Sequence, residues 1–348
     1  MGKQGPLENE MKLKRKNVLI IYTGGTIGMM QEYQSHALVP VDFKSITAQI
    51  PELKNLNCKI DFHSSDKLID SSNVQPSLWD ELATIIEKKY EKYDGFVILH
   101  GTDTMTYTAS ALSYMFNNLS KPVILTGSQL PLGVIRTDAK RNLITTIEIV
   151  AAKEVVPEVC IYFSSQLFRG NRSEKFTSSK FDAFQSLNYP VLAEAGVNIV
   201  YNKKAIRKKP SRKFSVSKGF DSSIALIKIF PGMQPAIIST IADKKGLKGI
   251  ILETFGSGNA PSDAKFLKCI DDAIKKKLIV VNISQCSGGA VEQGKYETSI
   301  NLKKLGVISG GDMTTEAAVT KLMFLVNKKI STKKIQELMK QDLCGERS

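Results

Sequence analysis

The 348-residue sequence predicts an α/β protein of two domains: a larger N-terminal domain with a mostly parallel sheet flanked by helices, and a smaller C-terminal domain on a second parallel sheet. Short runs rich in valine and isoleucine alternate with amphipathic segments of helix length, which is typical of a parallel sheet covered by helices. The alternation stops at a basic stretch and then resumes. The chain is long enough for each of two domains to bury a core.

In the first domain, strands are predicted at 18–22, 95–100 and 158–163, and in the segment 122–131, which ends in a glycine-containing loop. After residue 100, apolar residues recur at helical spacing, at positions 105, 109, 112 and 116. A second helix is predicted near 138–152.

In the second domain, strands are predicted at 223–230, 248–255 and 278–284, with helices near 235–244, 263–276 and 313–328. Asp312 and Ser331 are the predicted N-caps of the last helices. The predicted division of the chain is a basic tail at 1–16, an N-terminal catalytic domain at 17–202, a basic linker at 203–220 and a C-terminal domain at 221–348.

Composition excludes several classes. No segment approaches the roughly 18 apolar residues that a membrane span needs. Five cysteines without CxxC spacing argue against a disulfide framework or zinc site and favour a cytoplasmic protein. With only three histidines, a multi-histidine metal site and a Ser-His-Asp triad are disfavoured. We expect no metal and no cofactor.

The formal charge of +14 raises the question of a nucleic-acid partner. Much of it lies in KLKRK (12–16) and in residues 203–218, which carry eight basic side chains and no acidic one. Neither stretch matches a nucleic-acid motif or has aromatic residues interleaved beyond Phe214. A solvated tail and linker are therefore favoured over a nucleic-acid site.

The first candidate site is the glycine-rich loop in NVLIIYTGGTIGMM (17–30). A dinucleotide fingerprint is incomplete, because Thr23 stands where G-x-G-x-x-G needs its first glycine, and the Gly-Lys-Ser/Thr of a P-loop is absent. The loop presents Thr26 at the carboxyl end of a strand, where α/β proteins bind ligands. A structural turn and a catalytic loop are equally compatible with this motif alone.

The second candidate is HGTDTM (100–105), which follows another strand and begins a helix. Thr102 and Asp103 lie where backbone N–H groups are unpaired and anions are favoured. Ordinary N-capping by Asp103 or Thr104 is the alternative. Further polar loops are DSSN (70–73), LTGSQLP (125–131) and FRGNRSEKF (168–176), where Lys175 alone would be interpreted as a surface lysine.

Together IYTGGTIGMM, DSSN, HGTDTMTYTASAL, LTGSQLP and RGNRSEK resemble the L-asparaginase family, specifically its cytoplasmic type I branch. The resemblance continues through ETFGSGNAP, VNISQCSGG and GGDMTTEAAVTKL and covers roughly residues 17–345. It implies hydrolysis of the side-chain amide of L-asparagine through a threonine nucleophile and a β-aspartyl acyl-enzyme. By position, Thr26 would be the nucleophile, although Thr102 is an alternative, and Thr102, Asp103 and Lys175 would supply a base without histidine.

Substrate recognition is also implied by the resemblance. Asp103 matches the α-amino group of asparagine, and hydroxyl and N–H groups match its α-carboxylate. The full predicted substrate-binding set is Gly25, Asp70, Ser71, Ser72, Thr102, Asp103, Ser128 and Asn259. Because Asn259 would reach in from a neighbouring chain, a homodimer or homotetramer is implied.

Family members use a tyrosine to activate the nucleophile, often on a loop soon after TGGTI. That loop here reads SHALVPV (35–41), so Tyr33 and Tyr296 are both candidates, with Tyr296 favoured. Glu253 stands where some allosteric members can carry an arginine, which leaves activation by asparagine open. The preference for asparagine over glutamine is open too.

Two other functions are compatible with the motifs. The asparaginase-like subunit of a tRNA-dependent amidotransferase would suit a basic surface, but it carries an added N-terminal domain, and only about 16 residues precede the first strand here. A non-catalytic amino-acid sensor is the second alternative, against which Thr26, Thr102, Asp103 and Lys175 all argue, because each is intact.

Overall fold

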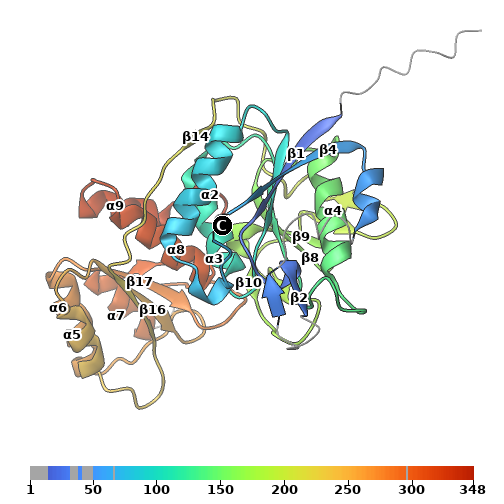
Figure 1. Cartoon of the computed structure of the whole chain (residues 1–348). Coiled ribbons are helices and arrows are strands. Elements are labelled where there is room, and N and C mark those ends of the chain that lie inside the picture. Colours follow the sequence, from blue (N-terminus) through green and yellow to red (C-terminus); the bar gives the residue numbers. More distant parts are fainter. Residues whose placement is uncertain (1–14, 32–37, 41–49, 66, 295–296) are drawn as a thin grey trace, which may run out of the picture.

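A computed structural model describes residues 15–31, 38–40, 50–65, 67–294 and 297–348. Within these residues, an eight-stranded and a four-stranded sheet form the frames of two α/β units, as the sequence predicts (Figure 1). No helix in the described ranges is long and apolar enough to cross a membrane.

The large sheet has the strand order β13-β12-β9-β8-β7-β5-β1-β4. Strands β4, β1, β5, β7 and β8 are parallel, so the ends of β1, β5 and β7 open onto one edge. The other three pair antiparallel, which the sequence did not predict. The strands are β1 (Lys16–Tyr22), β4 (Cys58–Ser64), β5 (Gly95–Leu99), β7 (Val123–Thr126), β8 (Val159–Phe163), β9 (Gln166–Arg169), β12 (Ala193–Ala195) and β13 (Ile199–Tyr201).

Helices cover both faces of this sheet, which is why its central strands are apolar without alternation. Helices α2 (Pro76–Lys89) and α3 (Met105–Met115) pack on one face, and α4 (Ala139–Ala151) packs on the other (Figure 1). Three of the four predicted strands and both helices of this unit are confirmed to within two residues; the third strand occupies the first part of its predicted segment.

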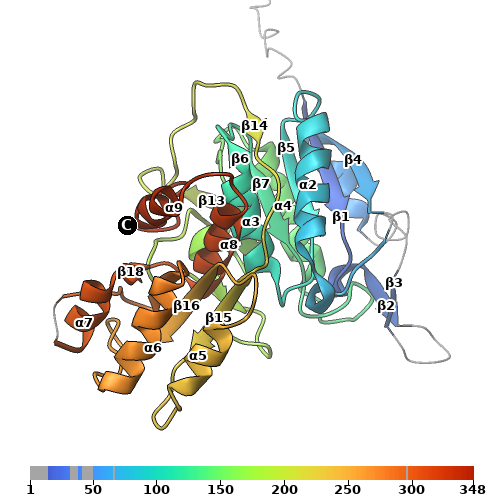
Figure 2. The same ribbon diagram turned by 90° about the vertical axis from the view of Figure 1, so that its left-hand side faces the viewer.

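The small sheet is parallel, with β15 (Ile224–Lys228), β16 (Gly249–Thr254), β17 (Ile279–Ser284) and β18 (Ile308–Ser309). Helices α5 (Ala236–Ala242) and α6 (Ala264–Lys275) bury apolar residues against one face, and α7 (Glu297–Leu305) follows α6 in contact with it. Helix α8 (Thr315–Val326) lies between the other face and α3, so one apolar core runs from the large sheet to the small one (Figure 2).

The N-cap of α8 is Thr314, whose hydroxyl accepts the Ala317 N–H at 3.2 Å. The prediction that Asp312 caps this helix is therefore wrong: its carboxylate lies 2.7 Å from Arg172 and accepts the Ser348 N–H. Asp312 is drawn away because a buried guanidinium needs a counter-charge. The predicted cap Ser331 is confirmed, since it accepts the Lys334 N–H at the start of α9 (Thr332–Lys340).

Short elements complete the described chain. Within the basic stretch, β14 pairs with β6 beside the end of α3. The remaining strands are β2 (Met29–Gln31), β3 (Leu38–Pro40), β6 (Phe116–Asn117), β10 (Glu174–Lys175), β11 (Phe184–Gln185) and β14 (Ser215–Val216); the 3-10 turns are η1 (Thr26–Gly28), η2 (Pro51–Asn55), η3 (Ser71–Asn73) and η4 (Gly170–Arg172).

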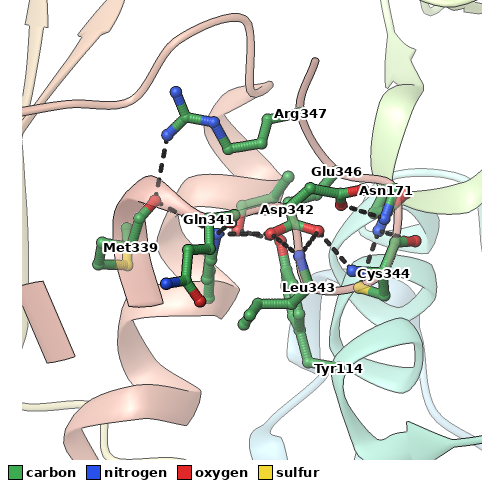
Figure 3. A network of polar contacts seen from close by, with 12 residues as sticks. Tyr114, Asn171, Met339, Gln341, Asp342, Leu343, Cys344, Glu346 and Arg347 are labelled. Atoms are coloured by element: carbon green, nitrogen blue, oxygen red, sulfur yellow. Dashed lines mark hydrogen bonds and ion pairs between the residues drawn. The ribbon is translucent and has the colours of Figure 1, made fainter. Parts of the chain in front are cut away.

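The C-terminal residues form a network of polar contacts (Figure 3), and a buried ion pair lies within it. Lys321 of α8 lies 2.5 Å from Glu346, and both side chains are fully buried. The Glu346 carboxylate also accepts the N–H groups of Leu343 and Cys344 at 2.8 to 3.1 Å. The Lys321 charge and these donors outweigh burial and lower the pKa of Glu346 to about 2.

We expect Glu346→Gln to lower the free energy of unfolding by about 3 to 5 kcal/mol, because it leaves Lys321 buried without a counter-charge. The folded-state pKa lies below the ordinary 4.5, so the native carboxylate stabilises the fold above that pH and loses this contribution as pH falls toward 2. Urea unfolding at several pH values would measure both effects. Glu337→Gln, which breaks the exposed pair with Lys334, is the control and should cost under about 1 kcal/mol. Equal losses in the two variants would contradict the prediction.

Candidate active site

The loop after β1 packs backbone to backbone on the loop after β5. Gly24 and Gly25 have φ of 119° and 87°, which side chains rarely adopt. A Cβ on Gly25 would lie 2.4 Å from the Gly101 nitrogen. Thr23 closes the junction, because its N–H and its hydroxyl both donate to the Leu99 carbonyl at 3.1 and 2.9 Å. Thr26 follows directly, half-buried at the start of η1.

The second half of this loop folds back onto β1. The Tyr22 hydroxyl donates to the Gly28 carbonyl at 2.9 Å, and a Cβ on Gly28 would lie 1.9 Å from that hydroxyl. Burial raises the pKa of Tyr22 to about 12, so this phenol keeps its proton and acts as a donor. The glycine pair before Thr26 and the contact of Gly28 with the buried tyrosine thus fix the loop on both sides of Thr26.

Lys175 joins the loop after β5 to the segment after β9. Its ammonium donates to the Thr102 hydroxyl and to the Asp103 carboxylate, each at 2.7 Å. The side chain of Lys175 is only 15% exposed, which contradicts the surface-lysine alternative, while that of Asp103 is 63% exposed. One cation therefore contacts a hydroxyl on its buried side and a carboxylate on its open side.

Helix capping does not explain these side chains. Thr104 occupies the N-cap of α3 but makes no capping bond; its hydroxyl donates to the Ser71 carbonyl at 2.7 Å. The Ser71 hydroxyl in turn accepts the Asp103 N–H at 3.3 Å. The DSSN turn is thus joined to the HGTDT loop by two hydrogen bonds.

Two other predicted residues of the DSSN turn satisfy each other. The Asp70 carboxylate accepts the N–H and the hydroxyl of Ser72 at 2.8 and 2.6 Å. These two bonds lower the pKa of Asp70. Asp70 is therefore the cap of η3, and it holds the turn in the shape that presents Ser71 to Asp103.

Gln129 contacts Thr102, although it was not among the predicted site residues. The Thr102 hydroxyl donates to its amide oxygen at 3.4 Å, and its amide nitrogen donates to the carbonyls of Ser178 and Lys180. The predicted Ser128 is buried, and its hydroxyl donates to Leu130 within the same loop. Only the position of the LTGSQLP loop after a parallel strand pointed to Gln129.

His100, the first residue of the HGTDT loop, is held by hydrogen bonds at both ring nitrogens. Its Nδ1 lies 2.7 Å from the Gly101 carbonyl and its Nε2 lies 2.9 Å from the Thr108 hydroxyl, which also accepts from Trp79. Complete burial lowers the pKa of His100 to about 4. The ring is therefore neutral near pH 7, with Nδ1–H as the donor to Gly101.

The structure thus brings together Thr102, Asp103, Lys175 and Ser71, with the Gly25 loop packed beside them. Asn259 lies in the turn after β16, in the other unit, where its backbone pairs with Phe255. Its predicted role across a subunit contact stays a prediction. Tyr33 and Tyr296 lie outside the described residues.

Comparison with known proteins gives the family. Residues 17–207 match the family model described as "Asparaginase, N-terminal", and residues 223–339 match "Glutaminase/Asparaginase C-terminal domain". These matches define an α/β protein of the asparaginase type in both of its units. The chain belongs to the asparaginase family.

Individual relatives match nearly all of this chain. The chain is 40% identical to L-asparaginase 1 of Escherichia coli K12, over 96% of this chain and 98% of that protein. The crystal structure of L-asparaginase I from Vibrio cholerae matches with a TM-score of 0.89 and 42% identity, over 96% of this chain and 99% of that one. The chain is also 33% identical to a glutamyl-tRNA(Gln) amidotransferase component of Methanosphaera stadtmanae, over 98% of this chain and 79% of that protein.

Proposed function

We propose that the protein hydrolyses the side-chain amide of L-asparagine to L-aspartate and ammonia, through Thr26 and a β-aspartyl acyl-enzyme. The observation that carries the proposal is the Lys175 ammonium shared between Thr102 and Asp103, beside the glycine loop of Thr26. Relatives named L-asparaginase, matching nearly the whole chain, support the choice of substrate.

The reaction has two steps. In the first, the Thr26 oxygen attacks the amide carbon, the C–N bond breaks, and the hydroxyl proton ends on the leaving nitrogen as ammonia departs. In the second, water attacks the ester carbon, the C–O bond to Thr26 breaks, and a water proton returns to the threonine oxygen. The threonine hydroxyl in the first step and water in the second are both weak nucleophiles, so each step needs a proton acceptor.

Lys175 and Thr102 supply the proton route in this proposal. A lysine accepts a proton only in its neutral form, and its contact with Thr102 at 2.7 Å gives the proton a path along a hydroxyl. The Asp103 carboxylate would bind the α-ammonium group of the substrate, because in its ion pair with Lys175 it is the partner exposed to solvent. The neutral amide of Gln129 holds the Thr102 hydroxyl in place without adding charge.

Hydroxyl and N–H groups would hold the anionic parts of the substrate. The α-carboxylate is assigned to Ser71, Ser72 and the backbone of the Gly25 loop, and the developing oxyanion to backbone N–H groups of the same loops. An oxyanion donor of this kind contributes typically about 3 kcal/mol. In this proposal Asn259 of a neighbouring subunit completes the pocket, Tyr296 or Tyr33 assists Thr26, and the working form is a homodimer or homotetramer.

Ammonia release from L-asparagine and L-glutamine, over a range of concentrations, tests the proposal. We expect turnover of asparagine; the ratio of the two rates measures the preference that the sequence leaves open, and the shape of the curve reports on cooperativity. The similarity to the amidotransferase component gives the second candidate, and its test is the same reaction with and without a charged glutamyl-tRNA and its partner subunit. A folded protein that releases no ammonia from either free amino acid would contradict the first proposal.

A further inference from the structure

A cavity of about 520 Å³ lies away from the candidate active site. It is bordered by the end of α3, the start of β8, residues 207–212 of the basic stretch, the end of α8 and the C-terminal residues Leu343 and Cys344. Helix α3 begins beside Thr102 and ends at this cavity, and its 11 residues span about 16 Å. The volume falls in the range of small-molecule sites, roughly 300 to 1,000 Å³.

The rim of this cavity is cationic. Arg207, Lys208 and Arg212 come from the basic stretch, and Lys328 comes from the segment after α8, so two parts of the chain far apart in sequence bring charge to one cavity. Within the part of the chain that the structure describes, no carboxylate oxygen lies within 4.0 Å of these four side chains, although the charge of Arg207 acts on the nearby Asp342 carboxyl. Burial lowers the pKa of Lys328, whose ammonium lies 4.3 Å from the centre of the Phe324 ring. This cation is thus held partly out of water against an aromatic ring.

The single acidic side chain in the described lining is already neutralised. Glu158 is buried and lies 2.5 and 3.2 Å from two nitrogens of Arg169, and it also accepts the backbone N–H of Arg207. The lining also includes the buried residues Tyr114, Phe116, Leu119 and Phe324, which form its apolar floor. A ligand with an anionic group and an apolar ring would be complementary to both the cationic rim and the apolar floor of the cavity.

We propose that this cavity binds a phosphorylated small molecule of nucleotide size, with its phosphates on the basic rim and its ring against the apolar floor. Arginine and lysine are the side chains that proteins use to hold phosphate, arginine with two parallel hydrogen bonds. A bare inorganic anion would leave the aromatic floor unused. A nucleic-acid strand would need cations spread along a track, whereas these converge on one cavity from two segments.

The test is calorimetric titration of the full-length protein with ATP, adenosine and inorganic pyrophosphate at constant ionic strength. We expect ATP to bind with one site per chain, and adenosine and pyrophosphate alone to bind more weakly. Arg207→Gln with Arg212→Gln should weaken ATP binding about tenfold or more, because charge-assisted hydrogen bonds are lost. Lys328→Met, on a different element, should weaken it in the same direction.

The matched control is Lys209→Gln with Lys213→Gln, which removes two exposed charges from the same stretch outside the cavity lining. It should change ATP affinity less than about twofold, since neither side chain lines the cavity and exposed charges are screened by salt. Equal weakening in both double variants would show that ATP binds through diffuse electrostatic attraction rather than in this cavity, and would overturn the proposal. Absence of ATP binding would overturn it too, as would tighter binding of a single-stranded oligouridylate that responds equally to both double variants.

Discussion

Replacing Thr26 by alanine should lower kcat for asparagine hydrolysis by at least about three orders of magnitude, because losing a nucleophile removes the covalent route entirely. The fold should persist, since the geometry of this loop rests on Gly24, Gly25 and the Tyr22 hydrogen bond to Gly28 rather than on the Thr26 side chain. Steady-state ammonia release, with circular dichroism and thermal unfolding in parallel, measures both effects.

Thr26→Ser is the matched control, because it keeps the hydroxyl and should retain measurable turnover. The covalent step can be examined directly by acid-quenching the reaction and locating the aspartyl adduct by peptide mass spectrometry. The adduct is expected on the peptide that contains Thr26. An adduct on Thr102, or a Thr26→Ala protein that still turns over at a comparable rate, would reassign the nucleophile.

Lys175→Met should lower kcat by about two to four orders of magnitude, the range for loss of a positioned acid or base. Methionine fills a similar volume, so the loss would come from the missing contacts with Thr102 and Asp103. Kinetic constants for asparagine would separate this effect from weaker binding, which would appear in KM. Lys265→Met, an exposed lysine on α6, is the control and should leave turnover unchanged.

Lys175→Arg distinguishes proton transfer from a merely structural charge. Arginine keeps the positive charge next to Asp103 but does not give up a proton in proteins, so it should not restore kcat. Recovery of most of the activity in Lys175→Arg would show that Lys175 only holds the two loops together. In that case the base must be sought elsewhere in the site.

Local pattern was sufficient for the central strands of both sheets. GFVILH became β5 and LIVVNIS became β17 because a run that is apolar without alternation fits a strand covered on both faces. The loops after β1 and β5, which are neighbours in the large sheet, lie against each other at one edge, since parallel strands end together. Asp312 was misjudged as a cap because a sequence does not reveal that a buried Arg172 competes for its carboxylate.

The sequence by itself determined the alternation of strands and helices, the family, and the identity of the residues that gather after β1, β5 and β9. Only the tertiary structure decided which of them touch: the pairing of Lys175 with both Thr102 and Asp103, the contact of Gln129 with Thr102, and the burial of Lys321 against Glu346. The physical reason is the distance along the sequence between the interacting residues. Strand and helix patterns depend on neighbours a few residues apart, whereas these contacts join residues 25 to 73 positions apart, and they depend on how strands, helices and loops pack against one another.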